Sequence, residues 1–227
     1  MVRILSDVLG HPQQRVAVSP QDTHYLTAVM RRRVGDFVEV LARDGQIWLG
    51  EWLGEGTILL KELALSGWAP RRQVILYQAL LKGDHFSEVV DRATQVGVSR
   101  IVPLVTHRCI VRDVTLNRMG RWRAIAKEAS EQSRRSGVPE LEELAFAEKL
   151  TAYPEAESYV LAPTARVDRP WLKENQGPLE LVVGPEGGLT PLEIERLGER
   201  GFSSLSIGHQ VFRSENAGSF AALLFLQ

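Results

Sequence analysis

Features that mark several classes of proteins are missing from this sequence of 227 residues. Its single cysteine, Cys109, excludes an internal disulfide and is typical of a protein in a reducing cytoplasm. No apolar run reaches the roughly 18 residues that a membrane span needs. Residues 1–7 contain no long apolar stretch of the kind found in a signal peptide. The sequence therefore predicts a cytoplasmic protein that does not contact a membrane.

Several catalytic motifs are missing as well. The five histidines have no metal-ligand spacing, and one cysteine cannot build a zinc site. Neither His-Glu-x-x-His nor Gly-x-Ser-x-Gly occurs, and no glycine-rich loop ends in Gly-Lys-Ser or Gly-Lys-Thr. No Gly-x-Gly-x-x-Gly follows the first strand of the expected sheet, which disfavours the ordinary dinucleotide fold. We expect no bound metal.

Charge is balanced over the whole chain but uneven along it. The formal net charge is −1, yet ten basic and only three acidic residues lie between Arg92 and Arg135. Arginine outnumbers lysine 22 to five, and its planar guanidinium suits bidentate contacts with phosphate. This pattern fits binding of RNA or another polyanion, and it fits a solvated helix face with local ion pairs equally well.

Residues 1–70 have the pattern of a small β-rich domain. Two runs rich in β-branched and aromatic residues, 34–41 and 46–53, flank Asp44-Gly45, which is a strong hairpin signal. A third strand is expected at 57–63, and a short helix at 22–30. Glycine, proline and charge interrupt the pattern at 66–72, and this places the domain boundary there.

Residues 71–227 alternate between strand and helix patterns. We expect strands at 74–81, 101–105, 159–162, 179–183 and 204–207, and helices at 86–96, 122–129, 191–200 and 217–226. The run at 74–81 is almost continuously apolar, as in a buried parallel strand. Thr190, Pro191 and Glu193 have the spacing of a capping box at a helix start. The predicted class is α/β with a mostly parallel sheet.

Three segments at strand ends are candidates for a binding site: 161–164, 184–188 and 207–217. Ligands of parallel sheets bind outside the carboxyl ends of the strands, and glycine lets the backbone approach them closely. A glycine-rich turn is often only a turn, but Arg213 and Glu215 just before an apolar helix favour a site. Among the histidines we retain only His209 as a candidate, because it lies next to Gly208.

Several ordered motifs resemble the RsmE family, a group of the SPOUT class of knotted methyltransferases. The two most specific are residues 181–190 with Glu193, and residues 207–217. Shorter matches follow the family's order at 24–26, 29, 31, 34–36, 82–84, 93–98, 103–104, 108–109, 123–133 and 138–140. The resemblance therefore spans nearly the whole chain.

The resemblance implies a fold and an activity that periodicity cannot reveal. It implies a PUA-like β-barrel over residues 1–70, a SPOUT-type trefoil-knotted domain over residues 71–227, and a homodimer. Knots are otherwise almost absent from proteins. The implied methyl donor is S-adenosylmethionine, and the implied substrate is the N3 atom of a uridine in 16S rRNA of the small ribosomal subunit, near the decoding centre.

A few positions depart from the family pattern. Gln210 stands where arginine is usual, which puts an RNA contact of that arginine in doubt, and Ser214 and Asn216 stand where threonine is usual. Serine keeps the hydroxyl group, whereas asparagine keeps only polarity. Arg134 replaces a usual glycine and Gly137 replaces a usual arginine, so the positive charge shifts from position 137 to position 134 and is not lost.

The implied reaction suggests roles for particular residues. Uracil must leave any stack or base pair and lose the N3 proton, and a fixed cation would stabilise the resulting charge. Arg213 is the candidate cation; Glu215 either orients Arg213 or accepts the proton, unless the two only pair to cap the last helix. The donor needs an apolar slot and backbone partners, for which the candidates are Leu161, Gly184, Pro185, Glu186, Gly187, Leu205, Ile207, Gly208, Val211, Phe212 and Arg213. Candidates for RNA phosphate contacts are Arg31, Arg32, Arg33, Arg108, Arg134 and Arg135.

Three other functions remain open. A related knotted methyltransferase acting on transfer RNA would differ in the modified nucleoside. A ribosome-assembly RNA-binding protein without catalysis would not bind S-adenosylmethionine. A small-molecule methyltransferase would leave the β-rich domain and the arginine-rich stretch without a purpose.

Overall fold

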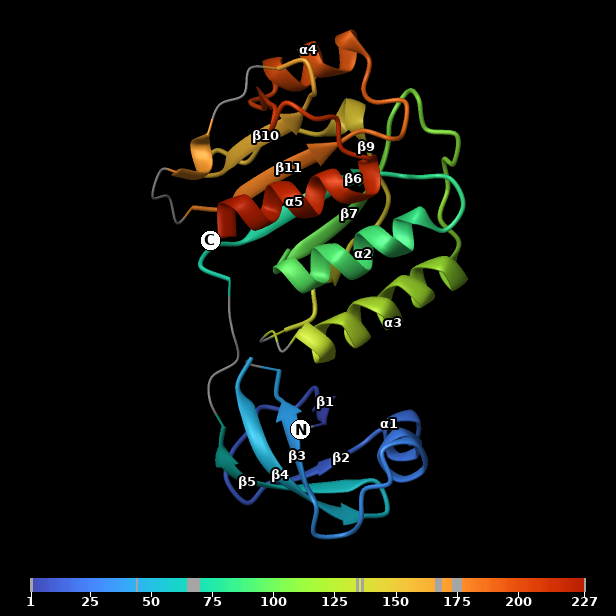
Figure 1. Ribbon diagram of the computed structural model, residues 1–227, viewed down its shortest axis with the longest axis vertical. Coiled ribbons are helices and arrows are strands. Elements are labelled where there is room, and N and C mark those ends of the chain that lie inside the picture. Colours follow the sequence, from blue (N-terminus) through green and yellow to red (C-terminus); the bar gives the residue numbers. More distant parts are fainter. Residues whose placement is uncertain are drawn as a thin grey trace. The chain divides into compact units, whose positions relative to one another are not determined.

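The chain divides into two units in the computed structural model (Figure 1), which describes residues 2–43, 45–64, 70–133, 135, 137–165, 169–172 and 177–226. One unit comprises Met1–Ala69 together with Ser130–Gly137, and the other comprises Pro70–Ala129 and Val138–Gln227. The segment 130–137 thus belongs with the first unit, whereas the sequence placed it in the α/β domain. Most of the expected boundary at 66–72 lies outside the described residues.

The small unit contains a five-stranded sheet. Its strands are β1 (Arg3–Leu5), β2 (Arg15–Ala17), β3 (Phe37–Leu41), β4 (Ile47–Gly54) and β5 (Thr57–Leu63), in the order β1-β3-β4-β5-β2. β1 runs parallel to β3, and the other neighbours are antiparallel. The hairpin predicted around Gly45 joins β3 to β4, with Leu41 opposite Ile47, although Asp44 itself lies outside the described residues. Among the described pairings none joins β1 to β2, so the sheet is open.

One face of this sheet forms the core of the small unit. Alternate residues of the strands point inward, and Val38, Val40, Trp52, Ile58 and Leu60 are at most 1% exposed. The expected helix is α1 (Pro20–His24), which continues as a π-helical turn, η1 (Tyr25–Val29). Its buried Leu26 joins the same core.

The second unit is built on a parallel sheet, which confirms the predicted α/β class. Its strands are β6 (Val74–Ala79), β7 (Arg100–Val105), β8 (Glu140–Leu141), β9 (Ala145–Phe146), β10 (Glu157–Leu161), β11 (Leu179–Val183) and β12 (Ser203–Leu205). The order is β12-β10-β11-β6-β7-β8, and β9 also pairs with β7. Every described pair is parallel. The central strands β6 and β11 are buried along their whole length, as their continuous apolar runs predict.

Helices cover both faces of this sheet (Figure 1). They are α2 (His85–Val96), α3 (Leu116–Ser133), α4 (Pro191–Glu199) and α5 (Ser214–Leu226), with 3₁₀ turns η2 (Ala147–Lys149) and η3 (Pro170–Leu172). Residues of α2, α3 and α5 pack with Leu76 and Leu181 on one face. On the other face, Leu197 of α4 and Ala147 of η2 pack with Tyr77 and Val182. In the described part of the chain no helix is long and apolar enough to cross a membrane.

A buried carboxylate joins three of the strands. Glu180 of β11 is fully buried and accepts hydrogen bonds from the Tyr77 hydroxyl at 2.9 Å, the Ser158 hydroxyl at 2.6 Å and the Tyr153 backbone N–H at 2.8 Å. Burial, and then the charge of Glu180, raise the pKa of the Tyr77 hydroxyl. Because a buried polar group without a partner is costly, these bonds help to fix the order of β6, β11 and β10.

The path of the chain brings distant segments to one end of the sheet. β12 lies at the sheet edge, yet α5, which follows it, packs against β11, β6 and α2 near the centre. The residues between β12 and α5 therefore cross the carboxyl ends of the strands. This is the end at which parallel α/β sheets bind their ligands.

Candidate active site

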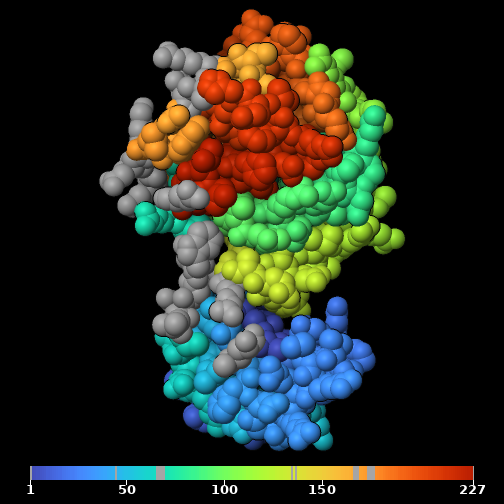
Figure 2. Space-filling model, in the orientation of Figure 1, coloured from blue at the N-terminus to red at the C-terminus, as the bar shows by residue number. Residues whose placement is uncertain are grey.

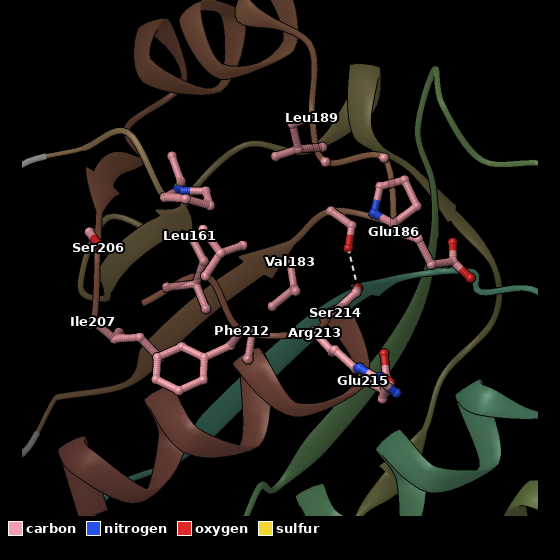
Figure 3. A pocket seen from close by; sticks show the side chains of 18 of the residues that line it. Leu161, Val183, Glu186, Leu189, Ser206, Ile207, Phe212, Arg213, Ser214 and Glu215 are labelled. Carbon is pink, nitrogen blue, oxygen red and sulfur yellow. Dashed lines mark hydrogen bonds and ion pairs between the residues drawn. The ribbon is translucent and has the colours of Figure 1, made fainter. Parts of the chain in front are cut away.

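A hollow of about 810 Å³ lies at the carboxyl ends of β10, β11 and β12 (Figure 3). All three segments selected from the sequence contribute to its wall: residues after β10, the glycine-rich turn after β11, and the stretch that leads into α5. Its volume falls within the range of about 300–1,000 Å³ that is usual for small-molecule sites.

One side of the hollow is apolar. Leu161, Val183, Ile207 and Phe212 face it from three different segments (Figure 3). Val183 is 3% exposed, and the Phe212 ring is held edge-on against Phe220 of α5, with centroids 5.4 Å apart. This side of the hollow therefore offers apolar contact to a ligand.

The glycine-rich turn has its shape because a side chain would not fit. A Cβ atom on Gly184 would lie 2.9 Å from the Leu189 backbone nitrogen, and Gly188 has φ of +69°. The Gly188 N–H donates to the Pro185 carbonyl at 2.8 Å, which closes the turn. The backbone consequently comes close to whatever occupies the hollow.

A chain of hydrogen bonds ties this turn to α5 and β6. The Ser214 hydroxyl donates to the Gly184 carbonyl (Figure 3) and accepts from Nε2 of Gln78 at 3.1 Å. Gln78 is fully buried in β6. The serine that replaces the usual threonine therefore uses its hydroxyl group to hold the wall of the hollow in place.

The other side of the hollow carries charge. The Arg213 side chain is 82% exposed and that of Glu215 only 9%, and Nη1 of Arg213 lies 3.9 Å from Oε1 of Glu215. Glu186 accepts a hydrogen bond from the Lys82 backbone N–H at 2.9 Å, which ties the turn after β6 to the glycine-rich turn. Arg213 and Glu215 thus lie together at the hollow, as a loosely associated pair rather than a tight one.

Asn216, the other departure from the family pattern, has a partner far away in the sequence. Its side-chain oxygen accepts a hydrogen bond from Arg92 of α2 at 2.7 Å, and Arg92 also donates to Glu88 at 2.7 Å. The hydrogen bond from His85, and then the one from Arg92, lower the pKa of Glu88. Asn216 therefore anchors the first turn of α5 to α2.

The structure brings together most residues that the sequence proposed for donor binding. Ten of these eleven line the hollow, and so does Glu215. Gly208 does not line it, but its carbonyl accepts a hydrogen bond from the Ser206 hydroxyl at 2.8 Å. His209 is exposed and is not part of the wall. The candidate segments 161–164, 184–188 and 207–217 supply further lining residues that were not named individually as donor contacts: Ala162, Pro163, Thr164, Gly188, Gln210, Ser214 and Ala217. Sequence reasoning gave no site role to the remaining lining residues, which are Lys82, His85, Val183, Leu189, Ile194 and Ser206.

The sequence gave no direct indication that Lys82 and His85 belong to the site, apart from the short motif at 82–84. They reach the hollow only because the chain folds.

Within the described part of the chain, no group of three or more histidine, cysteine, aspartate or glutamate side chains could hold a metal ion.

Comparison with known proteins assigns the chain to a family. A model described as RNA methyltransferase domain matches residues 69–226. The ribosomal RNA small subunit methyltransferase E of Synechocystis sp. is 31% identical over 91% of this chain and 71% of its own length. The protein of that name from Bacillus subtilis is 27% identical over 90% of this chain and 87% of its own length. The chain belongs to the ribosomal RNA small subunit methyltransferase E (RsmE) family.

Solved structures share the fold over nearly the full length. A protein from Legionella pneumophila, solved with the cofactor SAM bound, has 25% identity and a TM-score of 0.84, and covers 99% of this chain and 95% of its own. The RsmE protein of Neisseria gonorrhoeae, bound to S-adenosyl methionine, has 23% identity and a TM-score of 0.87 over 98% of this chain and 95% of its own. The two-unit architecture is therefore that of the RsmE family.

The arginines proposed for RNA contacts have different environments. Arg31 and Arg33 are exposed and Arg32 is partly exposed, directly after the π-helical turn, and Arg31 has φ of +52°, which is rare outside glycine. Arg108 is exposed and donates to the Gly187 carbonyl at 2.6 Å. Arg135 is 4% exposed, and burial lowers its pKa to about 10. Arg134 lies outside the described residues.

Proposed function

We propose that this RsmE-family protein transfers a methyl group from S-adenosylmethionine to N3 of a specific uridine in 16S rRNA of the small ribosomal subunit. The observation that carries the proposal is the hollow at the carboxyl ends of β10, β11 and β12. It combines an apolar wall, a close backbone turn and a charged side within one site. The family membership supports RNA as the class of substrate.

The hollow has the properties that the donor requires. Leu161, Ile207 and Phe212 offer apolar contact to an adenine ring, and the turn at Gly184 offers backbone hydrogen-bond partners at a position where a Cβ atom would collide. When bound, S-adenosylmethionine supplies a methyl group on a positively charged sulfur. Glu186 and the segment from Leu205 to Arg213 complete the proposed donor site, within which Gly208 is held by the Ser206 hydroxyl.

Arg213 and Glu215 are the proposed catalytic residues. The exposed guanidinium of Arg213 can reach a uracil carbonyl and stabilise the negative charge that spreads onto it when N3 loses its proton. Glu215 is nearly buried, and its only described side-chain partner is Arg213 at 3.9 Å. It either orients the guanidinium or takes up the N3 proton. The loose pairing argues against a purely helix-capping role for the two residues.

The finer features of the fold belong to the same proposal. The return of α5 from the sheet edge to its centre supports the trefoil knot. The five-stranded sheet has one buried face and is open between β1 and β2 among the described pairings, and it supports a PUA-like fold as a half-barrel, with Arg31, Arg32 and Arg33 as RNA contacts. α5 lies on one face of the α/β unit (Figure 2, red), and exposed apolar side chains on it support a homodimer: Phe220 at 41% and Leu223 at 40%.

The decisive experiment uses labelled S-adenosylmethionine and small ribosomal subunits that lack the modification, followed by nucleoside analysis of the RNA. We expect 3-methyluridine in 16S rRNA. Label in another nucleoside, or in transfer RNA only, would contradict the proposed substrate and keep the methyltransferase. Donor binding without any transfer to RNA would contradict the reaction, and loss of both donor binding and transfer would leave an RNA-binding protein.

A further inference from the structure

A second hollow, of about 330 Å³, lies in the α/β unit beside the first. The loop after β7, the strand β9 and the start of α4 surround it. One segment separates the two hollows, because Leu189 and Ile194 line the first whereas Thr190 and Glu193 line the second. A ligand in the second hollow would therefore lie next to the wall of the first hollow that Leu189 and Ile194 form.

The second hollow contains cationic side chains that a ligand can reach. Arg112 and Arg196 are exposed and line it. Arg112 donates only to backbone carbonyls of its own loop, including that of His107 at 3.1 Å. Among the described residues, neither arginine forms an ion pair.

Two carboxylates, Glu148 and Glu193, also line the hollow, so its formal charge is balanced. Burial would raise the pKa of Glu193, but hydrogen bonds from the His107 N–H, the Thr190 N–H and the Thr190 hydroxyl outweigh it and lower that pKa. Glu193 is thus ionised, and its oxygens are held by donors of the fold rather than by either arginine. Glu148 is exposed to solvent, like the two arginines. Neither carboxylate therefore occupies the guanidinium groups, which can meet a phosphate of the ligand.

An aromatic surface lies beside these cations. Phe146 of β9 is 40% exposed, and Nζ of Lys149 lies 5.6 Å from its ring centroid. Leu192 at the start of α4 lines the same hollow and is 52% exposed. An exposed ring next to unpaired arginines is the combination that holds a nucleotide of a single strand, through base stacking and phosphate contact.

We infer that the second hollow binds a nucleotide that flanks the target uridine in the RNA strand. Its phosphate would contact Arg112 and Arg196, and its base would stack on Phe146. The inference rests on the proposed RNA methyltransferase function and makes this hollow part of its substrate recognition. The hollow would thereby fix the register of the strand while the neighbouring uracil occupies the first site.

The test compares four variants of the full chain: Arg112→Ala, Arg196→Ala, Phe146→Ala and, as a control, Arg123→Ala. Arg123 is an exposed arginine of α3 that does not line either hollow. The measurements are kcat, the KM for unmodified small subunits, the affinity for a naked 16S rRNA fragment containing the target uridine at several salt concentrations, and donor affinity by calorimetry.

We expect the three variants in the hollow to bind RNA more weakly, with kcat and donor affinity unchanged. Each lost phosphate contact should reduce the slope of log affinity against log salt by about 0.7. Phe146→Ala should raise KM roughly five- to 150-fold, as loss of one stacked base does. Phe146→Tyr, which keeps an aromatic surface, should restore the KM and would separate stacking from misfolding.

Two outcomes would overturn the inference. In the first, the wild type is active, and all three variants have the same KM, RNA affinity and salt slope as the Arg123→Ala control. The other is a defect seen with assembled subunits but not with naked RNA, which would mean that the hollow contacts a protein. If the wild type transferred no methyl group but the three variants still bound RNA more weakly, the inference about the second hollow would be supported and the proposed methyltransferase function would be contradicted.

Discussion

Arg213 is the residue whose replacement separates catalysis from folding. Its side chain is 82% exposed, and among the described residues it approaches only Glu215, at 3.9 Å; so loose a pair with an exposed arginine contributes at most about 1 kcal/mol to stability. We expect Arg213→Ala to keep the thermal midpoint and to lower kcat by roughly 100- to 1,000-fold, as loss of one charge-stabilising donor does. Single-turnover kinetics at saturating donor measures this, with Arg213→Lys as the control that keeps the charge. Full methyl transfer in the alanine variant would rule out the catalytic role.

Ser214 offers a matched pair of variants at the same site. Ser214→Ala removes the donor to the Gly184 carbonyl and the acceptor for buried Gln78. We expect a loss of about 1–3 kcal/mol in the free energy of unfolding, because Gln78 is left without this partner, and weaker donor binding. Ser214→Thr keeps the hydroxyl and should match the wild type in urea unfolding and in donor calorimetry. A threonine variant as impaired as the alanine variant would show that shape, not the hydroxyl, is what matters.

Sequence reasoning found residues whose chemistry is visible locally and missed those whose role depends on distant partners. The glycines at 184, 187 and 188 and the charges at 213 and 215 stand next to a strand or a helix, so their use could be predicted. Gln78 meets Ser214, and Arg92 meets Asn216, across 136 and 124 positions of the chain. No periodicity carries such information, and only the packing of α5 onto β6 and α2 creates these contacts.

At the scale of elements, the start of α4 has a measurable dependence on pH. Thr190 and Glu193 form the predicted capping box, and the His107 N–H also donates to Glu193, at 2.7 Å. These bonds outweigh the effect of burial and lower the pKa of Glu193. A carboxyl whose folded-state pKa lies below its unfolded value, about 4.3 for glutamate, stabilises the fold above that value. This contribution is lost as the pH falls through the folded-state pKa.

Glu193→Gln tests this dependence. One amide oxygen cannot accept the bonds that two carboxylate oxygens accept, so we expect the free energy of unfolding at pH 7 to fall by about 1–2 kcal/mol. The difference from the wild type should shrink as the pH is lowered below about 4. Urea unfolding at pH 7 and at acidic pH measures it, with the exposed Glu195→Gln on the same helix as the control. A difference that is independent of pH would contradict the assignment.

The elements were predicted where the hydrophobic pattern is long enough to show its period. The expected ranges overlap β3–β7, β10, β11, α2 and α4 closely, because all but α4, which is marked by its capping box, have at least two buried residues at regular spacing. β1, β2, β8 and β9 were missed, since two or three residues carry no period. β12 ends at Leu205 rather than Ile207, and α5 begins at Ser214 rather than near Ala217. Both differences lie at the hollow, where binding geometry overrides local propensity.

At the scale of the whole molecule, the structure changes the meaning of the arginine-rich stretch. Arg118 donates to the Gly83 carbonyl at 2.8 Å, and Arg121 pairs with Asp84 at 2.7 Å, which lies at the start of α2. Arg92 is engaged with Glu88 and Asn216. Several charges that the sequence assigned equally to RNA or to local ion pairs thus hold helices together. The arginines left for RNA are fewer, and they lie in both units.

The two ligands of the proposed reaction should therefore respond differently to salt. The net charge of −1 gives no general attraction for RNA, so binding has to come from local cations such as exposed Arg31 and Arg33. The donor site relies on apolar and backbone contacts, and its affinity should change little between about 50 and about 300 mM salt, where the screening length falls from about 14 to about 6 Å. RNA affinity should fall steeply, and the slope of log affinity against log salt concentration should be about 0.7 for each single-strand phosphate contact.

The double variant Arg31→Gln/Arg33→Gln should reduce that slope by about 1.4 and leave donor affinity unchanged. Fluorescence anisotropy measures the RNA affinity, and calorimetry measures the donor affinity. If the RNA affinity of the wild type did not change with salt concentration, these arginines would be excluded as phosphate contacts, because neutralising phosphates necessarily releases counterions.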